Sequence, residues 1–250
     1  MIQLKTPEQI EIMRVAGRIT GEALLIAKEM IHEGITTKEI DEKINRYIKK
    51  QGAKPTFLGY GGFPGSACIS INDEVIHGIP SHKRMLKNGD IVKIDVGAMW
   101  HGFTGDSAAT FPVGEISEEA KKLIQATEES FYQGIKAIEN TPNPRIGDIG
   151  FAIQQYVEQR GYSVVREFTG HGVGANLHED PNVPNYGTQG RGVRIYSGMT
   201  LAIEPMVNSG THKVRMLNDG WGVVTADGAL SAHYEHSVAE DDNHGLGSDS

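Results

Sequence analysis

Cysteine is almost absent from this 250-residue sequence, because Cys68 is the only one. An intrachain disulfide and a zinc site built from several thiolates are therefore excluded. The sequence also contains no run of 18 apolar residues, and residues 1–10 lack the apolar core of a signal peptide. From these absences we expect a protein of the reducing cytoplasm that does not span a membrane.

A surplus of basic residues is also absent. Lysine and arginine number 24 against 32 aspartates and glutamates, which gives a net charge of −8 and no basic field for nucleic acid. Part of the negative charge lies in residues 240–250, which are rich in glycine and serine and contain almost nothing apolar. We expect these residues to form a disordered acidic tail behind a single domain at residues 1–239.

Two capping boxes predict the first two helices. The sequence Thr-Pro-Glu-Gln at residues 6–9 begins a helix that should run to about Met30. The sequence Thr-Thr-Lys-Glu at residues 36–39 begins a second helix, which Gly52 ends. The buried face of this second helix follows the i, i+4, i+7, i+8 spacing: Ile40, Ile44, Tyr47 and Ile48.

The same pattern recurs 109 residues later. Gly161 takes the place of Gly52, and the repeated helix face is Ile149, Ile153, Tyr156 and Val157. Further along, Gly198 corresponds to Gly89, and Glu204 corresponds to Asp95. Chance similarity is the alternative explanation. We expect instead that two helix-helix-strand units, at about residues 6–114 and 117–239, pack about a pseudo-twofold axis in one α+β domain.

Strands and loops alternate between the predicted helices. Residues 69–71, 91–96 and 201–204 are rich in Ile and Val and are predicted as strands. Residues 59–65 and 182–192 are rich in glycine and proline and are predicted as loops.

Asp95 lies in the predicted strand that begins at residue 91, and Asp106 lies in the strand that follows the next turn. A turn centred on Trp100 and His101 would place Asp95 directly opposite Asp106 on one face of a hairpin. Carboxylates about 5 Å apart repel each other unless a cation or a shared proton lies between them. Two solvated carboxylates on an exposed face are the alternative, but Ile94 and Val96 make the strand apolar.

Glycines surround one histidine in the sequence Thr-Gly-His-Gly-Val-Gly at residues 169–174. Such a setting clears space around His171 and presents its imidazole as a ligand, and His178 follows closely. A phosphate-binding loop is a weak alternative, because neither a Walker lysine nor a Gly-x-Gly-x-x-Gly pattern before a helix is present. The remaining histidines outside motifs are interpreted as structural or surface residues: His32, His82, His101, His212, His233, His236 and His244.

Two further carboxylates complete the set of candidate metal ligands. Glu204 stands at a strand end before Pro205, and Glu235 lies in the β-prone run 232–239. Together with the residues above, they give four carboxylates and one imidazole, which suit two divalent ions of Mn, Fe, Co or Zn better than a closed structural zinc site.

At this point the sequence resembles a known family, the type I methionine aminopeptidases, which share the pita-bread fold with creatinase and the proline-specific peptidases. The resemblance covers about residues 6–239. It rests on residues 68–80 (CISINDEVIHGIP), 94–96 with 105–106, 170–174 with 178–179, 203–206 and 234–236. It implies a curved antiparallel sheet covered by helices.

The resemblance also implies roles for individual residues. The metal ligands would be Asp95, Asp106, His171, Glu204 and Glu235, with Asp106 and Glu235 bridging two divalent ions. His77 and His178 would contact substrate, and Tyr60, Cys68 and Trp221 would line a methionine pocket. Leu177 departs from the family, many members of which have an aromatic residue there, and Phe57 is bulkier than expected. Both changes should alter the shape of the pocket.

These residues suggest a mechanism. Two metal ions would lower the pKa of a bridging water and polarise a peptide carbonyl. Glu204 would accept the proton of that water, His178 would donate to the carbonyl oxygen, and His77 would hold the substrate backbone near the next residue.

We therefore expect a monomeric aminopeptidase that removes the initiator methionine of nascent polypeptides when the second residue is small, with the ribosome as a further partner. One alternative is a proline-specific exopeptidase of the same fold, although such enzymes usually carry a large N-terminal domain. The other alternative is a non-catalytic peptide-binding protein, although such proteins tend to lose metal ligands.

Overall fold

The computed structural model describes residues 1–240, so all but the first residue of the predicted acidic tail lie outside the described residues. Four α-helices are present there: α1 (Pro7–Met30), α2 (Thr37–Lys50), α3 (Glu118–Glu139) and α4 (Ile146–Glu158). No helix of residues 1–240 is long and apolar enough to cross a membrane. Both predicted capping boxes form, since Thr6 and Thr36 accept hydrogen bonds from the backbone N–H groups of Gln9 and Glu39.

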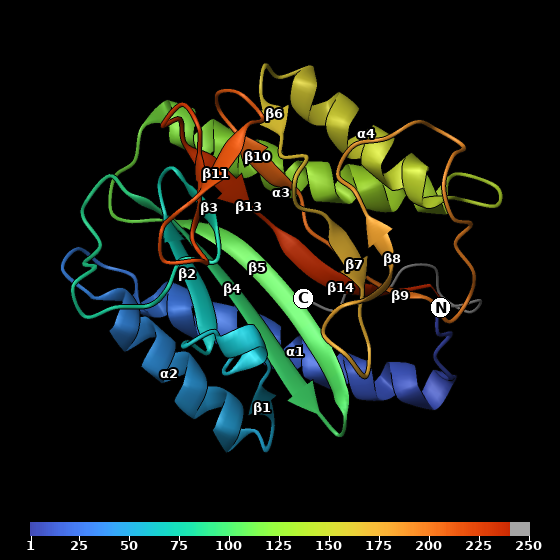
Figure 1. Ribbon diagram of the computed structural model, residues 1–250, viewed down its shortest axis with the longest axis horizontal. Coiled ribbons are helices and arrows are strands. Elements are labelled where there is room, and N and C mark those ends of the chain that lie inside the picture. Colours follow the sequence, from blue (N-terminus) through green and yellow to red (C-terminus); the bar gives the residue numbers. More distant parts are fainter. Residues whose placement is uncertain (241–250) are drawn as a thin grey trace.

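One large sheet runs through the centre of the molecule (Figure 1). Its eight strands lie in the order β1-β4-β5-β14-β9-β7-β8, with β2 paired to β4. Their bounds are β1 Lys54–Pro55, β2 Ala67–Ile71, β4 Ile91–Trp100, β5 Phe103–Pro112, β7 Gly170–Gly172, β8 Glu179–Val183, β9 Thr200–Ile203 and β14 Glu235–Ala239. Each strand pairing within residues 1–240 is antiparallel, as expected for this α+β fold.

Two small sheets flank the large one. One has the order β13-β10-β6, from Ser231–His233, Met206–Asn208 and Ser163–Val164. The other has the order β11-β12-β3, from Val214–Met216, Val223–Thr225 and Glu74–Ile76. A short 3-10 helix, η1 (Tyr60–Gly62), lies within the predicted loop 59–65. The predicted loop 182–192 begins as the end of β8, so that prediction was wrong at its first two residues.

The helices pack in pairs. In Figure 1, α1 and α2 lie together beside β4 and β5, whereas α3 and α4 lie together at the opposite side of the molecule. Each pair has its own hydrophobic cluster with neighbouring strands. The two helix faces related by 109 residues, on α2 and α4, are buried to the same extent. Their aliphatic side chains are all inaccessible to solvent: Ile40, Ile44, Ile48, Ile149, Ile153 and Val157.

The β4–β5 hairpin corrects the predicted register. The turn is His101–Gly102 rather than Trp100–His101, so Asp95 pairs with Ala108 and Asp106 pairs with Gly97. Both turn residues have positive φ, 48° at His101 and 86° at Gly102, as a two-residue turn of type I′ requires. The two aspartates are therefore diagonal neighbours rather than directly opposite, although they still share one face of the hairpin.

One close contact fixes α1 against the strand that carries Asp106. A Cβ atom at Gly105 would lie 2.5 Å from the backbone nitrogen of Gly17 in α1. The helix and the strand therefore touch backbone to backbone at this point, and only glycine leaves the necessary space.

We expect Gly105→Ala to lower the free energy of unfolding by about 1–3 kcal/mol, because the new methyl group must push α1 away from β5. Gly17→Ala is the matched control. A Cβ atom at Gly17 meets nothing within 4 Å, so this change should be neutral or stabilise the helix by up to about 1 kcal/mol. Urea unfolding of both variants measures the difference, and equal stabilities would contradict this account of the contact.

Candidate active site and metal centre

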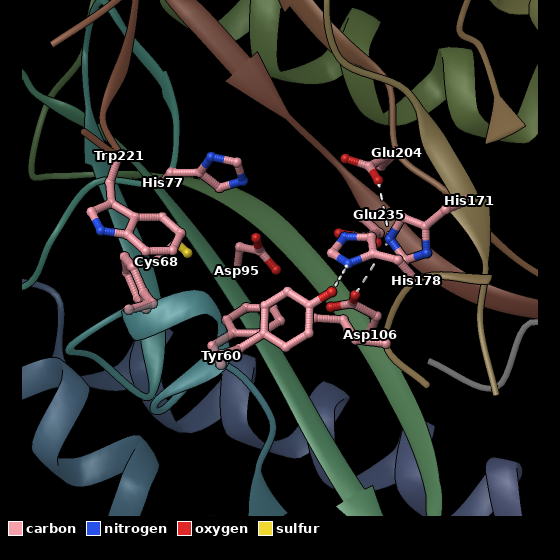
Figure 2. Close-up of a pocket in the computed structure, with 13 residues that line it drawn as sticks. Tyr60, Cys68, His77, Asp95, Asp106, His171, His178, Glu204, Trp221 and Glu235 are labelled. Carbon is pink, nitrogen blue, oxygen red and sulfur yellow. Dashed lines mark hydrogen bonds and ion pairs between the residues drawn. The ribbon is translucent and has the colours of Figure 1, made fainter. Parts of the chain in front are cut away.

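The five predicted metal ligands come from five strands that are neighbours in the large sheet. Following the sheet order, Asp95 lies on β4, Asp106 on β5, Glu235 on β14, Glu204 directly after β9, and His171 on β7. All five line one cavity of about 160 Å³. Residues separated by up to 140 positions in the sequence thus meet at one place, as Figure 2 shows.

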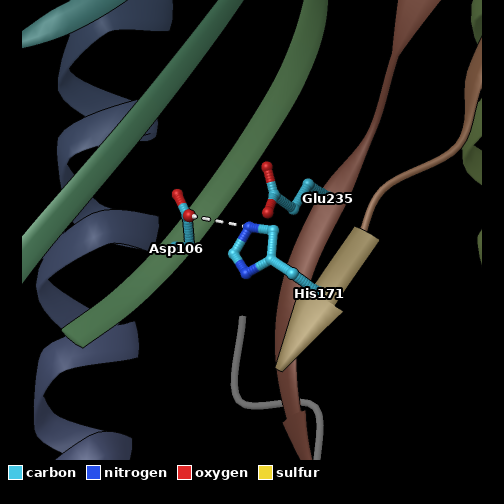
Figure 3. A group of neighbouring side chains, drawn as sticks. All are labelled: Asp106, His171 and Glu235. Atoms are coloured by element: carbon cyan, nitrogen blue, oxygen red, sulfur yellow. Dashed lines mark ion pairs between the residues drawn. The ribbon is translucent and has the colours of Figure 1, made fainter. Parts of the chain in front are cut away.

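The imidazole of His171 faces the carboxylates. Its Nε2 lies 3.8 Å from Asp106 Oδ2 and 3.5 Å from Glu204 Oε1, and Figure 3 shows the ring turned toward Asp106 and Glu235. The other ring nitrogen, Nδ1, lies 2.9 Å from the backbone oxygen of Gly172 and donates to it. This hydrogen bond leaves Nε2 unprotonated, which is the form that binds a metal ion.

The glycines beside His171 have a packing role that the sequence analysis did not identify. A Cβ atom at Gly170 would lie 2.3 Å from the carbonyl oxygen of Ala202, and one at Gly172 would lie 2.3 Å from that of Asp180. The backbones on both sides therefore approach β7 too closely for any side chain at these two positions. Glycine here brings His171 near the carboxylates of the adjacent strands.

The four carboxylates cannot all be ionised without a counterion. Burial raises the pKa of Asp95 to about 8. Burial, reinforced by repulsion from neighbouring carboxylates, raises the pKa values of Asp106, Glu204 and Glu235 well above their ordinary range. Burial lowers the pKa of His171 to about 4, so that its ring is neutral at pH 7.

Unpaired oxygens show that this site fits bound cations. Oδ1 of Asp95, Oδ1 of Asp106 and Oε1 of Glu235 are buried and make no hydrogen bond within residues 1–240. Buried oxygens of this kind normally have a partner, and carboxylate oxygens with one neutral imidazole are suitable ligands for divalent transition metals. Side chains from two groups come close enough to hold an ion: Asp106, His171 and Glu235, and Glu204, His233 and Glu235.

The residues predicted to contact substrate surround the same cavity. His77, His178, Tyr60, Cys68 and Trp221 all line it. The hydroxyl of Tyr60 lies 2.8 Å from Nδ1 of His178. Burial lowers the pKa of His77 to about 4 and lowers that of His178, so both rings are neutral at pH 7. Burial also raises the pKa of the Cys68 thiol, which is therefore not a thiolate.

Phe57 and Leu177, the two departures from the expected pattern, both lie in the cavity wall. They pack in one hydrophobic cluster with Phe63 and Cys68. A Cβ atom at Gly97 would lie 2.6 Å from the ring of Phe57, so the bulk of the phenyl group is accommodated by a glycine on β4.

Sequence reasoning missed two residues of the site. Phe63 lines the cavity and packs edge-on against Trp221, with ring centroids 5.1 Å apart. His233, interpreted as an ordinary histidine, is buried beside Glu204 and Glu235. A signal for His233 was present, since His233 and Glu235 are two residues apart in a β-prone run and such residues share a face.

Comparison with known proteins agrees with this geometry. Residues 11–239 match the model of metallopeptidase family M24. The chain belongs to this family of metallopeptidases. It is 56% identical over 241 residues to a methionine aminopeptidase of Clostridium perfringens, covering 96% of this chain and 95% of that relative.

Solved structures give the same family and the pita-bread fold. A methionine aminopeptidase of Thermotoga maritima superimposes on this M24 peptidase with a TM-score of 0.95 at 45% identity, covering 99% and 98% of the two chains. A prolidase of Pyrococcus furiosus matches with a TM-score of 0.73 at 23% identity, and the match covers 64% of the prolidase chain. That second likeness concerns the fold alone.

We expect the affinity for Mn²⁺ to rise as the pH increases from 6.5 to 8. Because the raised pKa values keep protons on the metal-free carboxylates, binding must displace them, and affinity should increase about tenfold per pH unit for each proton displaced. His171 is neutral throughout this range and contributes no proton. Titration calorimetry in two buffers of different ionisation enthalpy measures both affinity and proton release. Affinity independent of pH, with no protons released, would contradict this prediction.

Proposed function

We propose that this chain, a methionine aminopeptidase, removes the initiator methionine from nascent polypeptides when the second residue is small. The observation that carries the proposal is the meeting of four carboxylates and one imidazole beside a small, largely apolar cavity. A cavity of about 160 Å³ suits one side chain rather than a drug-sized ligand. The high identity to methionine aminopeptidases over nearly the whole chain supports the same function.

The proposed cofactor is a pair of divalent ions, either Co, Mn, Fe or Zn. Asp95, Asp106, His171, Glu204 and Glu235 would hold them, with Asp106 and Glu235 shared between the two. When bound, such ions supply an activated water and polarise a carbonyl group. The unpaired carboxylate oxygens support this assignment.

Glu204 is proposed to accept the proton of the attacking water and to pass it to the leaving amine. Burial raises the pKa of this glutamate well above its ordinary value, which makes the carboxylate a better proton acceptor. The backbone of Glu204 is fixed at its carbonyl oxygen, which accepts a 3.0 Å hydrogen bond from the side-chain amide of Asn185. Pro205 follows directly, so the residue has little backbone freedom.

His178 is proposed to donate a hydrogen bond to the substrate carbonyl oxygen as negative charge develops there. If the hydroxyl of Tyr60 donates to Nδ1 of His178, the proton of the neutral ring stays on Nε2. His77 is proposed to hold the substrate backbone. Its ring stands edge-on to Phe168 and Trp221, with ring centroids 5.9 and 6.5 Å away, which limits its rotation.

Tyr60, Cys68 and Trp221 are proposed to bind the methionine side chain, together with Phe57 and Phe63. Sulfur and aromatic groups make favourable contacts with a thioether. A free α-amine would bind at the metal end of the cavity, which explains why cleavage stops after one residue. A small second residue would be required because His77 and His178 crowd the space next to the scissile bond.

We further propose that residues 1–239 act as a single catalytic domain with related halves at about 6–114 and 117–239. Two helix pairs with separate clusters, and equal burial of the repeated faces, support the two halves.

The proposed setting is the cytoplasm, with a monomeric enzyme that meets its substrates at the ribosome. The lack of a basic charge surplus argues against a direct role for nucleic acid.

A peptide panel tests the function. After chelation and reconstitution with each of the four metals in turn, we expect cleavage of Met-Ala-Ser, little cleavage of Met-Leu-Ser, and none of acetyl-Met-Ala-Ser. The bulky second residue is disfavoured by crowding, and acetylation removes the free amine. Turnover of Xaa-Pro peptides in place of Met-Ala-Ser would favour the proline-specific alternative. No turnover with any metal would favour a non-catalytic protein.

Two variants separate the proposed roles. Glu204→Gln should lower kcat by about 10²–10⁴-fold and weaken metal binding, because it removes both a proton acceptor and a charged ligand. His178→Ala should lower kcat by about 10²–10³-fold and leave the bound metal unchanged. Steady-state kinetics and metal analysis of the purified proteins measure these effects. Near-normal turnover of Glu204→Gln with metal supplied, or metal loss in His178→Ala, would refute the respective assignment.

A further inference from the structure

His233 lies beside the carboxylates of the active site but has no part in the mechanism above. It is the last residue of β13 and is 2% exposed. Its Nε2 lies 3.7 Å from Glu204 Oε2 and 3.8 Å from Glu235 Oε2. Glu204 is therefore flanked by two imidazoles, since its other oxygen, Oε1, lies 3.5 Å from Nε2 of His171.

The backbone of His233 is fixed on both sides by one side chain. Its N–H donates to the hydroxyl oxygen of Thr110 at 2.9 Å, and its carbonyl oxygen accepts from the same hydroxyl at 2.8 Å. In addition, His233 pairs with Met206 across β13 and β10. The ring thus projects from a firmly held strand end toward Glu204 and Glu235.

The ring nitrogens of His233 lack partners. Neither Nδ1 nor Nε2 makes a hydrogen bond within the described part of the chain. Polar atoms that are buried without a partner destabilise a protein, so a ring in this position needs an interaction in the working enzyme. When they are ionised, the carboxylates in front of Nε2 can accept a hydrogen bond from this nitrogen.

We propose that His233 is a positioning residue, whose Nε2–H donates a hydrogen bond to Oε2 of Glu204 and so orients this carboxylate for proton transfer. The proposal rests on the proposed function, because it takes Glu204 as the proton acceptor. At 3.7 Å the two atoms are not yet hydrogen-bonded. Hydrogen bonds of catalytic groups are often long without substrate and shorten in the working complex.

A comparison with His171 favours a donor over a sixth metal ligand. His171 donates Nδ1–H to the Gly172 carbonyl oxygen, which keeps its Nε2 free for a metal ion. Nδ1 of His233 makes no such bond in residues 1–240. No hydrogen bond there therefore holds the proton of the neutral ring on Nδ1 instead of Nε2. Oε2 of Glu204 and Oε2 of Glu235 both lie in front of Nε2, at 3.7 and 3.8 Å, where ionised carboxylates can accept a hydrogen bond from it.

Two substitutions distinguish a donor from a ligand. His233→Gln keeps an N–H donor but provides a poor ligand for transition metals, whereas His233→Leu is apolar and cannot donate. We expect His233→Leu to lower kcat on Met-Ala-Ser about 10- to 100-fold, with KM changed less than about threefold. His233→Gln should remain within about fivefold of the unmodified enzyme in kcat, because the donor is restored. Both variants should bind as many Mn²⁺ ions as the unmodified chain by titration calorimetry.

Nuclear magnetic resonance provides a readout that does not depend on activity. Long-range ¹H–¹⁵N spectra of protein labelled with ¹⁵N-histidine distinguish a protonated from an unprotonated ring nitrogen, and the spectrum of His233→Gln identifies the signals of His233. We expect Nε2 of His233 to carry a proton in the protein loaded with Zn²⁺.

Two results would overturn the proposal. An unprotonated Nε2 in the Zn²⁺ protein, with loss of bound metal in His233→Gln, would make His233 a ligand. Unchanged kcat in His233→Leu would leave His233 with a packing role only. Failure of the proposed function looks different, because the unmodified enzyme would then not cleave Met-Ala-Ser, whatever the state of the His233 ring.

Discussion

Mutual repulsion among four carboxylates that lie close together and mostly out of solvent is the constraint on which the rest of the structure depends. Asp95, Asp106, Glu204 and Glu235 come from adjacent strands and face one cavity, where burial raises the pKa of each. Such a cluster is unfavourable in the absence of cations or protons. The fold nevertheless holds these side chains together, and their mutual repulsion would favour a bound cation.

The strands that carry the carboxylate cluster are held in place by close contacts of their backbones. Gly105 brings β5 against α1, and Gly170 and Gly172 bring β7 against its neighbours. Thr110 ties the end of β13, with His233, to β5 through two hydrogen bonds. In each case the contact involves backbone atoms, so the position of a functional side chain follows from the packing of strands rather than from flexible side-chain contacts.

Local patterns in the sequence predicted some of this structure well. The starts of α1 and α2 follow from capping boxes, because a cap depends on residues within one turn. The predicted hairpin register was wrong because the turn places His101 at a positive φ, which is uncommon for a residue other than glycine.

The convergence of the site could not be predicted from spacing, because the order β4-β5-β14-β9-β7 is a property of the whole sheet. The candidate ligands were identified by residue type and setting, and the family resemblance supplied their common location. His233 was missed because a lone histidine in an ordinary strand is most often structural. The structure then shows that the last residue of β13 lies next to Glu204.

Because the site is distributed over five strands, its side chains are brought together by folding of the sheet and not by binding of a cofactor. The conformational entropy that must be given up to bring residues 95 and 235 together is lost when the sheet forms, so a metal ion would find these side chains already close together. A metal ion that binds there would therefore not have to order the chain. Exchange of one suitable divalent ion for another would then require no rearrangement of the strands.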